Sequence, residues 1–524
     1  MPEVSSHKKV VWTVAGSDSG GGAGLQADLK ALACWPVHAC SAVAAITAQN
    51  SAAVTRVDAV APDLLDAQLA ALAADLPPAA LKTGLLGSAE NLRVLVRWID
   101  RLRQNGPLAV VVDPVLRATT GAALASGELR QAYLTELLPR TTLLTPNRAE
   151  AAALLGWPAL NTPAEVEAAS AALRALGAQA VVITGGDAVG DTANAAHSHD
   201  HVDSPHASGW LSAPRVASPH HHGSGCVFAS SAAAALALGH VAVDAVVLAK
   251  MATAHAIAHG YPAGQGAGPV QPTPGFAQQL AHLPRMGLPG QGPLSADSPA
   301  QAFAPLASPN LGLYAVVDSA AWVQRVLAAG VRTVQLRVKD PLQPDLREQV
   351  RASVAAARAA GAQLFINDHW ALALAEGADG VHLGQEDLAS ADLGALARAG
   401  VRLGISTHSL WEMCRAWALQ PSYVACGPIH ATASKDMPWL PQGNGNLAYW
   451  SQLLPLPVVG IAGMNAQRLT DAFAHGAAGV ALISGITAAP NPEAAVAELL
   501  AATAVGQQQA RVAAPPWPRP TLAG

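Results

Sequence analysis

The second half of the chain repeats a strand-like run followed by a helix-like run eight times. The strand-like runs are short aliphatic blocks at residues 312–318, 332–337, 363–367, 379–384, 402–406, 422–427, 457–462 and 479–484. Strands that alternate with helices favour a parallel sheet, because each helix returns the chain to the same edge. Eight such units in roughly 190 residues are what a compact (β/α)8 TIM barrel requires.

Polar side chains stand where two neighbouring strands of this half are expected to end. Asn367 and Asp368 close one strand, and Asp387 follows the next. Ligands bind at the carboxyl ends of the strands in such folds. Two carboxylates there suit Mg²⁺, which takes a couple of carboxylates together with substrate phosphates. The structural alternative is that each aspartate caps the helix after its strand.

The first half also alternates strand-like and helix-like segments. Residues 10–18 form a buried strand pattern, a glycine-rich turn leads into a helix-like segment, and the next strand ends on Gln49 and Asn50. Further strand-like runs end at 87, 116, 150 and 187, which predicts a parallel sheet covered by helices. The glycine-rich turn either brings backbone and a helix N-terminus close to an anion or is simply a tight turn.

A second glycine-rich turn precedes the small-residue helix pattern that begins near residue 224. Gly223, Ser224 and Gly225 would leave several backbone N–H groups pointing one way, as in an oxyanion or phosphate cradle. Cys226 falls in the first helical turn, where the pKa of a thiol tends to be lowered. The alternative is a buried structural cysteine in an alanine-rich helix.

Residues 185–219 look irregular and carry His197, His199, His201 and His206. Their spacing matches no fixed metal-ligand geometry, so we favour a solvated hairpin or loop insertion over a metal site.

The pattern of strands and helices dissolves between residues 261 and 310 into Pro, Gly, Gln and Ser, with one short helix expected near 276–283. We therefore predict a first domain over 1–275, a linker over 276–310, a second domain over 311–503 and a disordered tail over 504–524.

Composition narrows the function classes further. A formal charge of −5 gives no reason to expect nucleic acid or an acidic membrane as partner. The longest apolar run, residues 227–249, contains serine, histidine and aspartate and does not read as a membrane span. No signal peptide is visible, and five scattered cysteines favour a reducing cytoplasm.

Seven motifs occur in one order between residues 15 and 226: AGSDSGGGAGLQADLKAL, TAQNS, LKTGLLGS, DPV, TPNRAEAAALLG, TGGD and HGSGC. Together they closely resemble hydroxymethylpyrimidine/phosphomethylpyrimidine kinase, an enzyme of thiamine biosynthesis with a ribokinase-like α/β/α sandwich. The resemblance implies ATP as phosphoryl donor, Gln49 as a ligand of the pyrimidine, charge stabilisation by Gly223–Gly225, and Cys226 near the acceptor hydroxyl. Asn147 and Glu150 match a pattern found near Mg²⁺ in such kinases, or else form a surface helix pair. The chain departs from the family at 184–187, where Thr-Gly-Gly-Asp replaces a frequent Lys-Gly-Gly-His.

The second half resembles thiamine-phosphate synthase over residues 311–500. The motifs QLRVK, IND, GVHLGQED, GISTHS, GPIHATASK, GIAGMN and ALISGI follow the order of that family. The resemblance implies Mg²⁺ on Asp368 and Asp387, with substrate held by Gln335, Leu336, Arg337, Val338, Lys339, Asn367, Ser406, Thr432, Ala433, Ser434, Lys435, Gly463, Ile483 and Ser484. Arg337 and Lys435 would also stabilise the leaving diphosphate. Val338 and His430-Ala431 depart from the residues usual at those places.

The two resemblances together imply consecutive steps of one pathway. ATP would phosphorylate 4-amino-5-hydroxymethyl-2-methylpyrimidine twice, and the diphosphate would condense with thiazole phosphate to give thiamine phosphate and pyrophosphate. One alternative is a pyridoxal-type or sugar kinase fused to another phosphate-binding barrel. Another is a pyrimidine kinase fused to a non-catalytic barrel that only binds thiamine phosphate. Small molecules are the expected partners, and a homo-oligomer is possible because ribokinase-like domains often pair.

Overall fold

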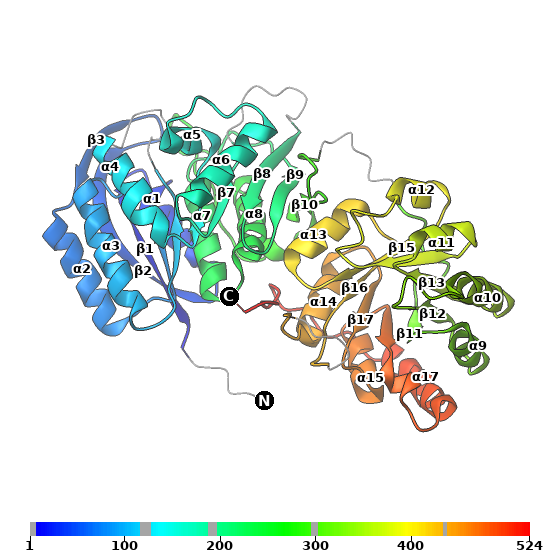
Figure 1. Ribbon diagram of the computed structural model, residues 1–524. Coiled ribbons are helices and arrows are strands. Elements are labelled where there is room, and N and C mark those ends of the chain that lie inside the picture. The colour runs from blue at the N-terminus through cyan, green and yellow to red at the C-terminus, as the bar shows by residue number, and fades with distance from the viewer. Residues whose placement is uncertain (1–6, 116–126, 187–195, 295–301, 433–437, 524) are drawn as a thin grey trace. The chain divides into compact units, whose positions relative to one another are not determined.

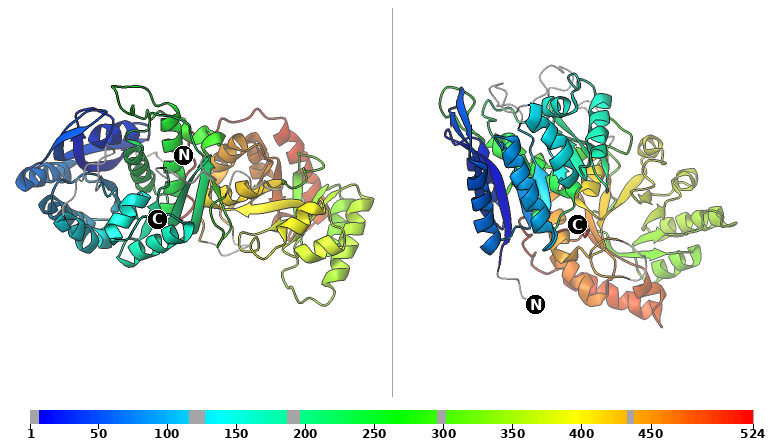
Figure 2. Two further views of the ribbon diagram at one scale, coloured as in Figure 1. Left: turned by 90° about the horizontal axis from the view of Figure 1, so that it is seen from above. Right: turned by 60° about the vertical axis from the view of Figure 1, so that its left-hand side comes forward.

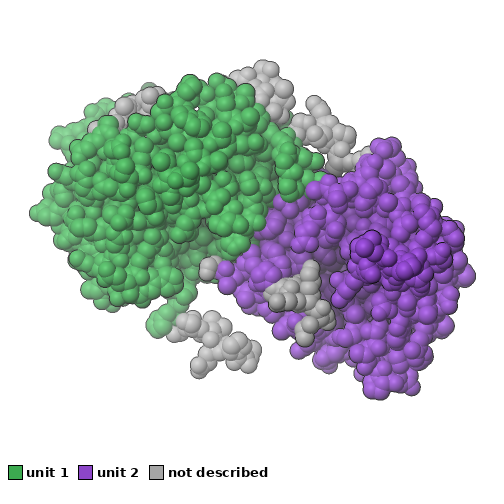
Figure 3. Space-filling view, viewed as in Figure 1, with its two compact units in different colours: residues 1–296, 524 green, residues 297–523 purple. Residues whose placement is uncertain are grey.

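The computed structural model describes residues 7–115, 127–186, 196–294, 302–432 and 438–523. The chain divides into two compact units, with the division between Ala296 and Asp297 (Figure 3).

The first unit is built on a ten-stranded sheet with the order β10-β9-β8-β7-β6-β5-β4-β1-β2-β3. Its six central strands are parallel: β1 (Lys9–Asp18), β2 (Val37–Gln49), β4 (Ala80–Thr83), β5 (Ala109–Val112), β6 (Leu143–Leu144) and β7 (Ala180–Ile183). The antiparallel strands lie at the edges: β3 (Val54–Ala59), β8 (His197–Asp203), β9 (Ser208–Pro214) and β10 (Arg285–Met286).

Helices cover this sheet, as Figure 1 shows. One group packs together as α1 (Gly24–Leu32), α7 (Ser224–Ala237) and α8 (Ala242–Ala258). The other helices are α2 (Pro62–Asp75), α3 (Ala89–Arg103), α4 (Gly127–Ala132), α5 (Arg148–Leu155) and α6 (Pro163–Ala175). The expected ribokinase-like α/β/α sandwich is therefore confirmed.

The histidine-rich segment is a hairpin, which is one of the two structures predicted for it, but its histidines are partly buried rather than solvated. It forms the hairpin β8–β9, which extends the sheet beside β7. His199 and His201 are buried, and their rings hydrogen-bond the hydroxyls of Ser212 at 2.8 Å and Ser170 at 2.9 Å. Each imidazole is thus accommodated by a serine partner. Within the described ranges, no group of three or more His, Cys, Asp or Glu side chains is placed to hold a metal ion.

The second unit contains a closed barrel of eight parallel strands in sequence order, which confirms the TIM barrel (Figure 2). The strands are β11 (Gly312–Val317), β12 (Thr333–Leu336), β13 (Gln363–Asn367), β14 (Gly380–Leu383), β15 (Arg402–Thr407), β16 (Tyr423–Cys426), β17 (Val458–Ile461) and β18 (Gly479–Leu482). The helices of this unit are α9 (Ala320–Ala328), α10 (Leu346–Ala359), α11 (Trp370–Ala375), α12 (Leu393–Arg398), α13 (Leu410–Leu419), α14 (Gly443–Leu453), α15 (Ala466–Ala474), α16 (Ser484–Thr487) and α17 (Pro492–Gln507).

Aromatic rings fill the barrel because glycines on neighbouring strands leave room for them. Tyr314, Phe365 and Tyr423 belong to one buried cluster. A Cβ on Gly404 would lie 2.2 Å from Cζ of Tyr423, and one on Gly380 would lie 2.5 Å from the ring of Phe365. Both distances are far below van der Waals contact, so these two positions need glycine for packing reasons.

The segment expected as a linker over 276–310 is partly structured. Two short 3₁₀ turns, at Phe276–Gln278 and Leu280–His282, are followed by β10, which pairs with β9. The N–H of Phe303 donates to the Gln420 carbonyl, and that of Ala307 to Gln363 Oε1, so the chain is already bound to the barrel at these positions. The composition of this segment resembles that of a linker, but isolated apolar residues such as Phe276 are buried and hold the segment against the fold.

The tail, for which composition predicts disorder over 504–524, also makes specific contacts. Helix α17 continues to Gln507, and the N–H of Val512 donates to the Ala474 carbonyl at 2.8 Å. The N–H of Arg519 donates to Asn446 Oδ1 at 2.7 Å. Across the described part of the chain, no helix combines the length and apolar character needed to cross a membrane.

Candidate active sites

In the first unit, two glycine-rich turns meet at the carboxyl end of β1. The Asp18 carboxylate ends β1 and accepts the N–H groups of Gly20, Gly22 and Ala23 at 2.8–3.0 Å. Gly223, the N-cap of α7, has a φ of +84°, and a Cβ there would lie 2.0 Å from the carbonyl oxygen of Gly22. The first turn of α7 therefore lies beside the turn that follows β1, and the N–H of Ser224 already donates to the His221 carbonyl at 3.2 Å. A helix N-terminus in this place favours an anion.

Gln49, the expected pyrimidine ligand, lies at the same end of the sheet. Its Nε2 is 3.4 Å from His222 Nε2, and that ring nitrogen is 3.5 Å from Asp18 Oδ2. Burial raises the pKa of Asp18, but the hydrogen bonds from His222 and the backbone outweigh it and hold the pKa below its usual range. Sequence reasoning missed Asp18 and His222, although both flank the glycine motifs.

Cys226 lies in the first turn of α7 as expected, but its thiol behaves differently. The residue retains some exposure, yet burial raises the pKa of the thiol to about 12, and the nearby Lys82 ammonium only partly opposes this. The expectation of a lowered thiol pKa is therefore wrong. Burial destabilises the thiolate more than the helix N-terminus and the Lys82 ammonium stabilise it. Cys226 is therefore a neutral thiol at neutral pH.

A buried ion pair lies close to Cys226 and was also missed. Lys82 on β4 is fully buried and donates to both carboxylate oxygens of Asp28, at 2.9 and 3.0 Å. Asp28 also accepts the hydroxyls of Thr13 at 2.5 Å and Ser230 at 2.9 Å. A lysine within the aliphatic run ALKTGLLG was the available signal, since a lysine is almost never fully buried unless it is paired.

Asn147 and Glu150 form a capping box at the start of α5. Asn147 Oδ1 accepts the N–H of Glu150 at 2.8 Å, and Glu150 Oε2 accepts the N–H of Asn147 at 2.9 Å. These bonds give both side chains a structural role. Their position near Mg²⁺ stays a prediction.

Two alanine substitutions separate the fold of the cradle from its chemistry. Gly223→Ala would place a methyl group 2.0 Å from a backbone oxygen at a positive φ, so we expect it to unfold the turn and to lower the melting temperature of the first unit. A Cβ on Gly225 would meet no atom of the described chain within 4 Å. Gly225→Ala should therefore keep the melting temperature and lower kinase activity only by occupying the open cradle. Calorimetry with a kinase assay checks both, and equal melting temperatures for the two variants would contradict the close packing of the turns.

In the second unit, Asp368 and Asp387 come together at the mouth of the barrel. Burial first, and then the Asp387 carboxylate, raise the pKa of Asp368 to about 6. Burial disfavours the charged carboxylate and the neighbouring like charge adds to this effect, whereas a bound cation would oppose both. Helix α11 is capped by His369 and α12 by Asp392. The alternative in which Asp368 and Asp387 serve as helix caps is therefore wrong.

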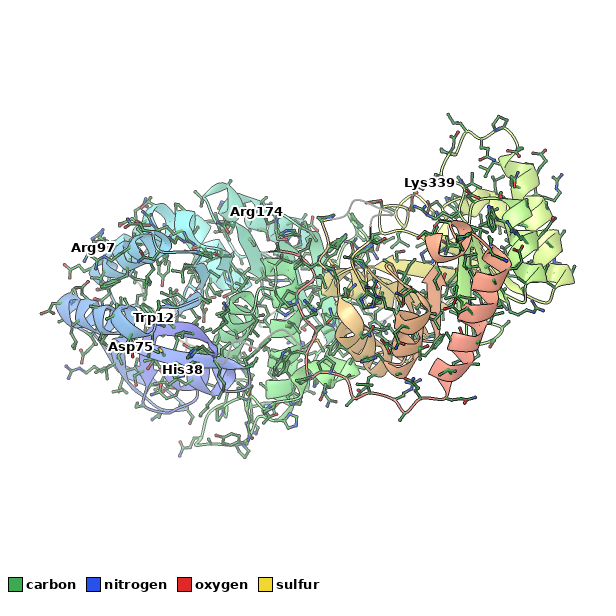
Figure 4. The ribbon with its side chains drawn as sticks, turned by 90° about the horizontal axis from the view of Figure 1, so that it is seen from below. Trp12, His38, Asp75, Arg97, Arg174 and Lys339 are labelled. Atoms are coloured by element: carbon green, nitrogen blue, oxygen red, sulfur yellow. The ribbon has the colours of Figure 1, made fainter. Side chains whose placement is uncertain are left out.

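The remaining predicted residues follow the same ends of the strands. Gln335 and Asn367 are buried near the ends of β12 and β13, and Lys339 lies in the loop after β12 (Figure 4). The positive charge of Arg337 opposes the rise in the pKa of Asp368 and contributes to the lowering of the pKa of His382. Ser406 is the penultimate residue of β15, and its carbonyl oxygen accepts a hydrogen bond from Gln385 Nε2 at 2.8 Å.

The expected binding residues for the second phosphate lie after β17 and β18. Gly463 has a φ of +66°, and a Cβ there would lie 2.6 Å from the Ala431 carbonyl oxygen. Ile483 is the N-cap of the short helix α16, which Ser484 begins. Phosphate sites of barrels are commonly formed by these loops.

Some predicted residues do not offer side chains to this mouth. Leu336 and Val338 are buried, at 1% and 4% exposure, so a ligand would meet them through the backbone. Thr432 is described, whereas Ala433, Ser434 and Lys435 lie outside the described residues.

His382 is the residue of this site that sequence reasoning missed. Its Nε2 is 2.8 Å from Ser406 Oγ, and its Nδ1 is 2.7 Å from the hydroxyl of Tyr423. Burial, with a smaller effect of Arg337, lowers the pKa of His382 to about 4. Its place in the GVHLGQED motif was a signal, because a histidine in an aliphatic strand needs polar partners.

An anion cradle in an α/β sandwich and a barrel mouth with acidic and cationic side chains occur in one chain. Together they define a two-domain enzyme that handles phosphorylated small molecules.

The family model for phosphomethylpyrimidine kinase matches residues 18–271, and that for thiamine monophosphate synthase matches residues 313–486. A probable thiamine biosynthetic bifunctional enzyme of Oryza sativa is 33% identical over 93% of this chain and 88% of its own length. The thiamine-phosphate synthase of Rhizobium etli is 50% identical over 36% of this chain and 94% of its own length. A pyridoxal kinase structure from Staphylococcus aureus shares 32% identity and a TM-score of 0.45 over 50% of this chain and 93% of that one.

The chain belongs to the family of bifunctional thiamine biosynthetic enzymes, which joins a phosphomethylpyrimidine kinase to a thiamine-phosphate synthase. Its first unit uses ATP to phosphorylate hydroxymethylpyrimidine and its monophosphate. Its second unit condenses the resulting diphosphate with thiazole phosphate.

Proposed function

We propose that the barrel mouth holds the pyrimidine diphosphate through a magnesium ion on Asp368 and Asp387. The observation that carries this proposal is the juxtaposition of the two carboxylates: after burial, the Asp387 carboxylate is the next cause that raises the pKa of Asp368 to about 6. Two carboxylates with room for substrate oxygens are a donor set that fits Mg²⁺. When bound, the ion would neutralise charge on the departing diphosphate.

The cationic and polar side chains around this pair hold the rest of the substrate. Arg337, Lys339 and Lys435 spread the charge of the diphosphate, and Asn367 and Ser406 supply hydrogen-bond donors. Gln335 faces the aminopyrimidine. The thiazole phosphate is bound by Thr432, Ala433, Ser434, Gly463, Ile483 and Ser484.

The condensation follows from this placement. The thiazole nitrogen gives its electron pair to the methylene carbon of the pyrimidine, and the bond from that carbon to the diphosphate oxygen breaks. The electron pair of that bond leaves with pyrophosphate, whose growing charge is stabilised by Arg337 and Lys435. The electron-rich aminopyrimidine tolerates positive charge at the methylene carbon, so no protein nucleophile is required.

In the kinase unit, the N–H groups at Gly223–Gly225 stabilise the transferring phosphoryl group while Gln49 orients the pyrimidine. Cys226 lies beside the acceptor hydroxyl. As a neutral thiol, it positions that hydroxyl as a polar neighbour and does not act as a charged base. All five cysteines are free thiols, which supports a reducing compartment such as the cytoplasm.

Metal removal tests the barrel proposal without involving the kinase. The full-length protein is given pyrimidine diphosphate and thiazole phosphate directly, and thiamine phosphate is measured by mass spectrometry. We expect chelation to abolish product formation and added Mg²⁺ to restore it. In Asp368→Asn the concentration of Mg²⁺ for half-maximal activity should rise at least about tenfold, because one charged ligand is lost. Activity that persists in chelator, or an unchanged requirement in the variant, would exclude the proposed ion site.

A further inference from the structure

A chain of buried hydrogen bonds crosses the barrel beneath its mouth. His382 bonds Ser406 Oγ through Nε2 at 2.8 Å and the Tyr423 hydroxyl through Nδ1 at 2.7 Å. The Tyr423 hydroxyl is 2.8 Å from that of Tyr314. The chain therefore links side chains from four strands: Ser406 on β15, His382 on β14, Tyr423 on β16 and Tyr314 on β11.

The barrel holds the middle of this chain rigidly. Tyr423 is fully buried, and its ring lies 5.7 Å from that of His382 at an interplanar angle of 27°. Phe365 packs against it edge-on at 5.1 Å. Because any side chain at Gly404 would overlap the Tyr423 ring, the space for the phenol is built into β15.

The directions of these hydrogen bonds depend on one another. Burial raises the pKa of Tyr314 and of Tyr423, so both phenols keep their single hydrogen. The imidazole of His382 is neutral and carries one N–H and one acceptor nitrogen. Each of the three groups can donate only one hydrogen along the chain, and fixing one bond fixes the others.

We propose that Tyr423 and Tyr314 are positioning residues for the synthase reaction, acting through His382 on Ser406. Tyr423 donates to His382 Nδ1, the Nε2–H of His382 donates to Ser406 Oγ, and Ser406 keeps its own O–H for an oxygen of the diphosphate. The inference rests on the proposed function, in which Ser406 contacts that anion. In the opposite direction, the Ser406 hydroxyl would donate its hydrogen to His382 Nε2. Only the lone pairs of Ser406 Oγ would then face the diphosphate, and they would repel its negative charge.

The tautomer of His382 tests the direction in the unmodified protein. Full-length protein labelled with ¹⁵N-histidine is examined by NMR without substrate, and the His382 signals are identified by their loss in His382→Gln. We expect hydrogen on Nε2. Hydrogen on Nδ1 would overturn the proposal, and this outcome does not depend on whether the barrel makes thiamine phosphate.

Kinetics test whether Tyr423 acts through Ser406. Tyr423→Phe removes one hydroxyl and should lower kcat of the synthase reaction about tenfold with a smaller change in KM, the loss expected for one hydrogen bond that matters in the transition state. In a Ser406→Ala background the same substitution should cost less than about twofold, because its target is already absent. Losses that multiply would mean that Tyr423 has only a packing role.

Two further variants serve as matched controls. Phe365→Leu disturbs the ring packing of Tyr423 without touching the hydrogen bonds, so the ¹⁵N pattern of His382 should not change. Tyr314→Phe leaves the Tyr423 hydroxyl in place, and we expect it to retain hydrogen on Nε2 with a smaller loss of kcat. A changed tautomer in Phe365→Leu would show that packing, and not the hydroxyl chain, sets the state of His382.

Discussion

Replacing Asp387 by alanine is expected to abolish thiamine phosphate formation while pyrimidine phosphorylation continues. The substitution removes one of the two carboxylates that face each other at the barrel mouth. The charge stabilisation lost with such a group corresponds to a decrease of about 10²- to 10³-fold in kcat. The measurement is a mass-spectrometric assay of full-length protein given hydroxymethylpyrimidine, ATP, Mg²⁺ and thiazole phosphate, in which pyrimidine diphosphate should accumulate.

Glu386→Ala is the matched control for this experiment. Glu386 precedes Asp387 in the same loop and is exposed to solvent, so its removal tests the loop and the overall charge without changing the facing carboxylates. Its product yield should equal that of the unmodified protein. Loss of both activities in Asp387→Ala would contradict two independently working units.

Replacing Asp28 by alanine should be the most destabilising single change in the kinase unit. Lys82 would then lose the carboxylate that it contacts at 2.9 Å and keep only Asp113, whose Oδ2 lies 3.7 Å away, and the hydroxyls of Thr13 and Ser230 would lose their acceptor. Breaking a buried pair in this way costs about 3–5 kcal/mol of unfolding free energy. For a unit of this size that lowers the melting temperature by about 6–20 °C.

The exposed pair between Arg56 and Asp58 provides the comparison. Their side chains are 74% and 55% exposed although the contact is only 2.7 Å. Asp58→Ala should therefore cost less than about 1 kcal/mol. Calorimetry of both variants checks the prediction, and we expect the unfolding transition of the barrel to stay where it is. If Asp28→Ala and Asp58→Ala lowered the free energy of unfolding equally, burial would not govern the strength of these ion pairs.

Local patterns in the sequence were sufficient to predict the barrel. Its eight strands appear within one or two residues of the predicted ranges, because a buried parallel strand is a short aliphatic run that a helix pattern separates from the next. The meeting of Asp368 and Asp387 could be predicted for the same reason, since strands β13 and β14 are neighbours and end at the same edge. The structure of the linker and of the tail was harder to predict from the sequence. A few specific contacts, such as those of Phe276 and Arg519, determine it, and such contacts leave no periodic pattern in the sequence.

The sequence by itself determined the two α/β units, their order and the family to which the chain belongs, since motif order and strand period are properties of the linear chain. Only the tertiary structure decided the protonation of Cys226, the pairing of Lys82 with Asp28, and the joining of Ser406 to Tyr314 through His382 and Tyr423. The physical reason is that desolvation and hydrogen bonding depend on which groups surround a side chain in space. Those neighbours come from positions as far apart in the chain as Tyr314 and Tyr423.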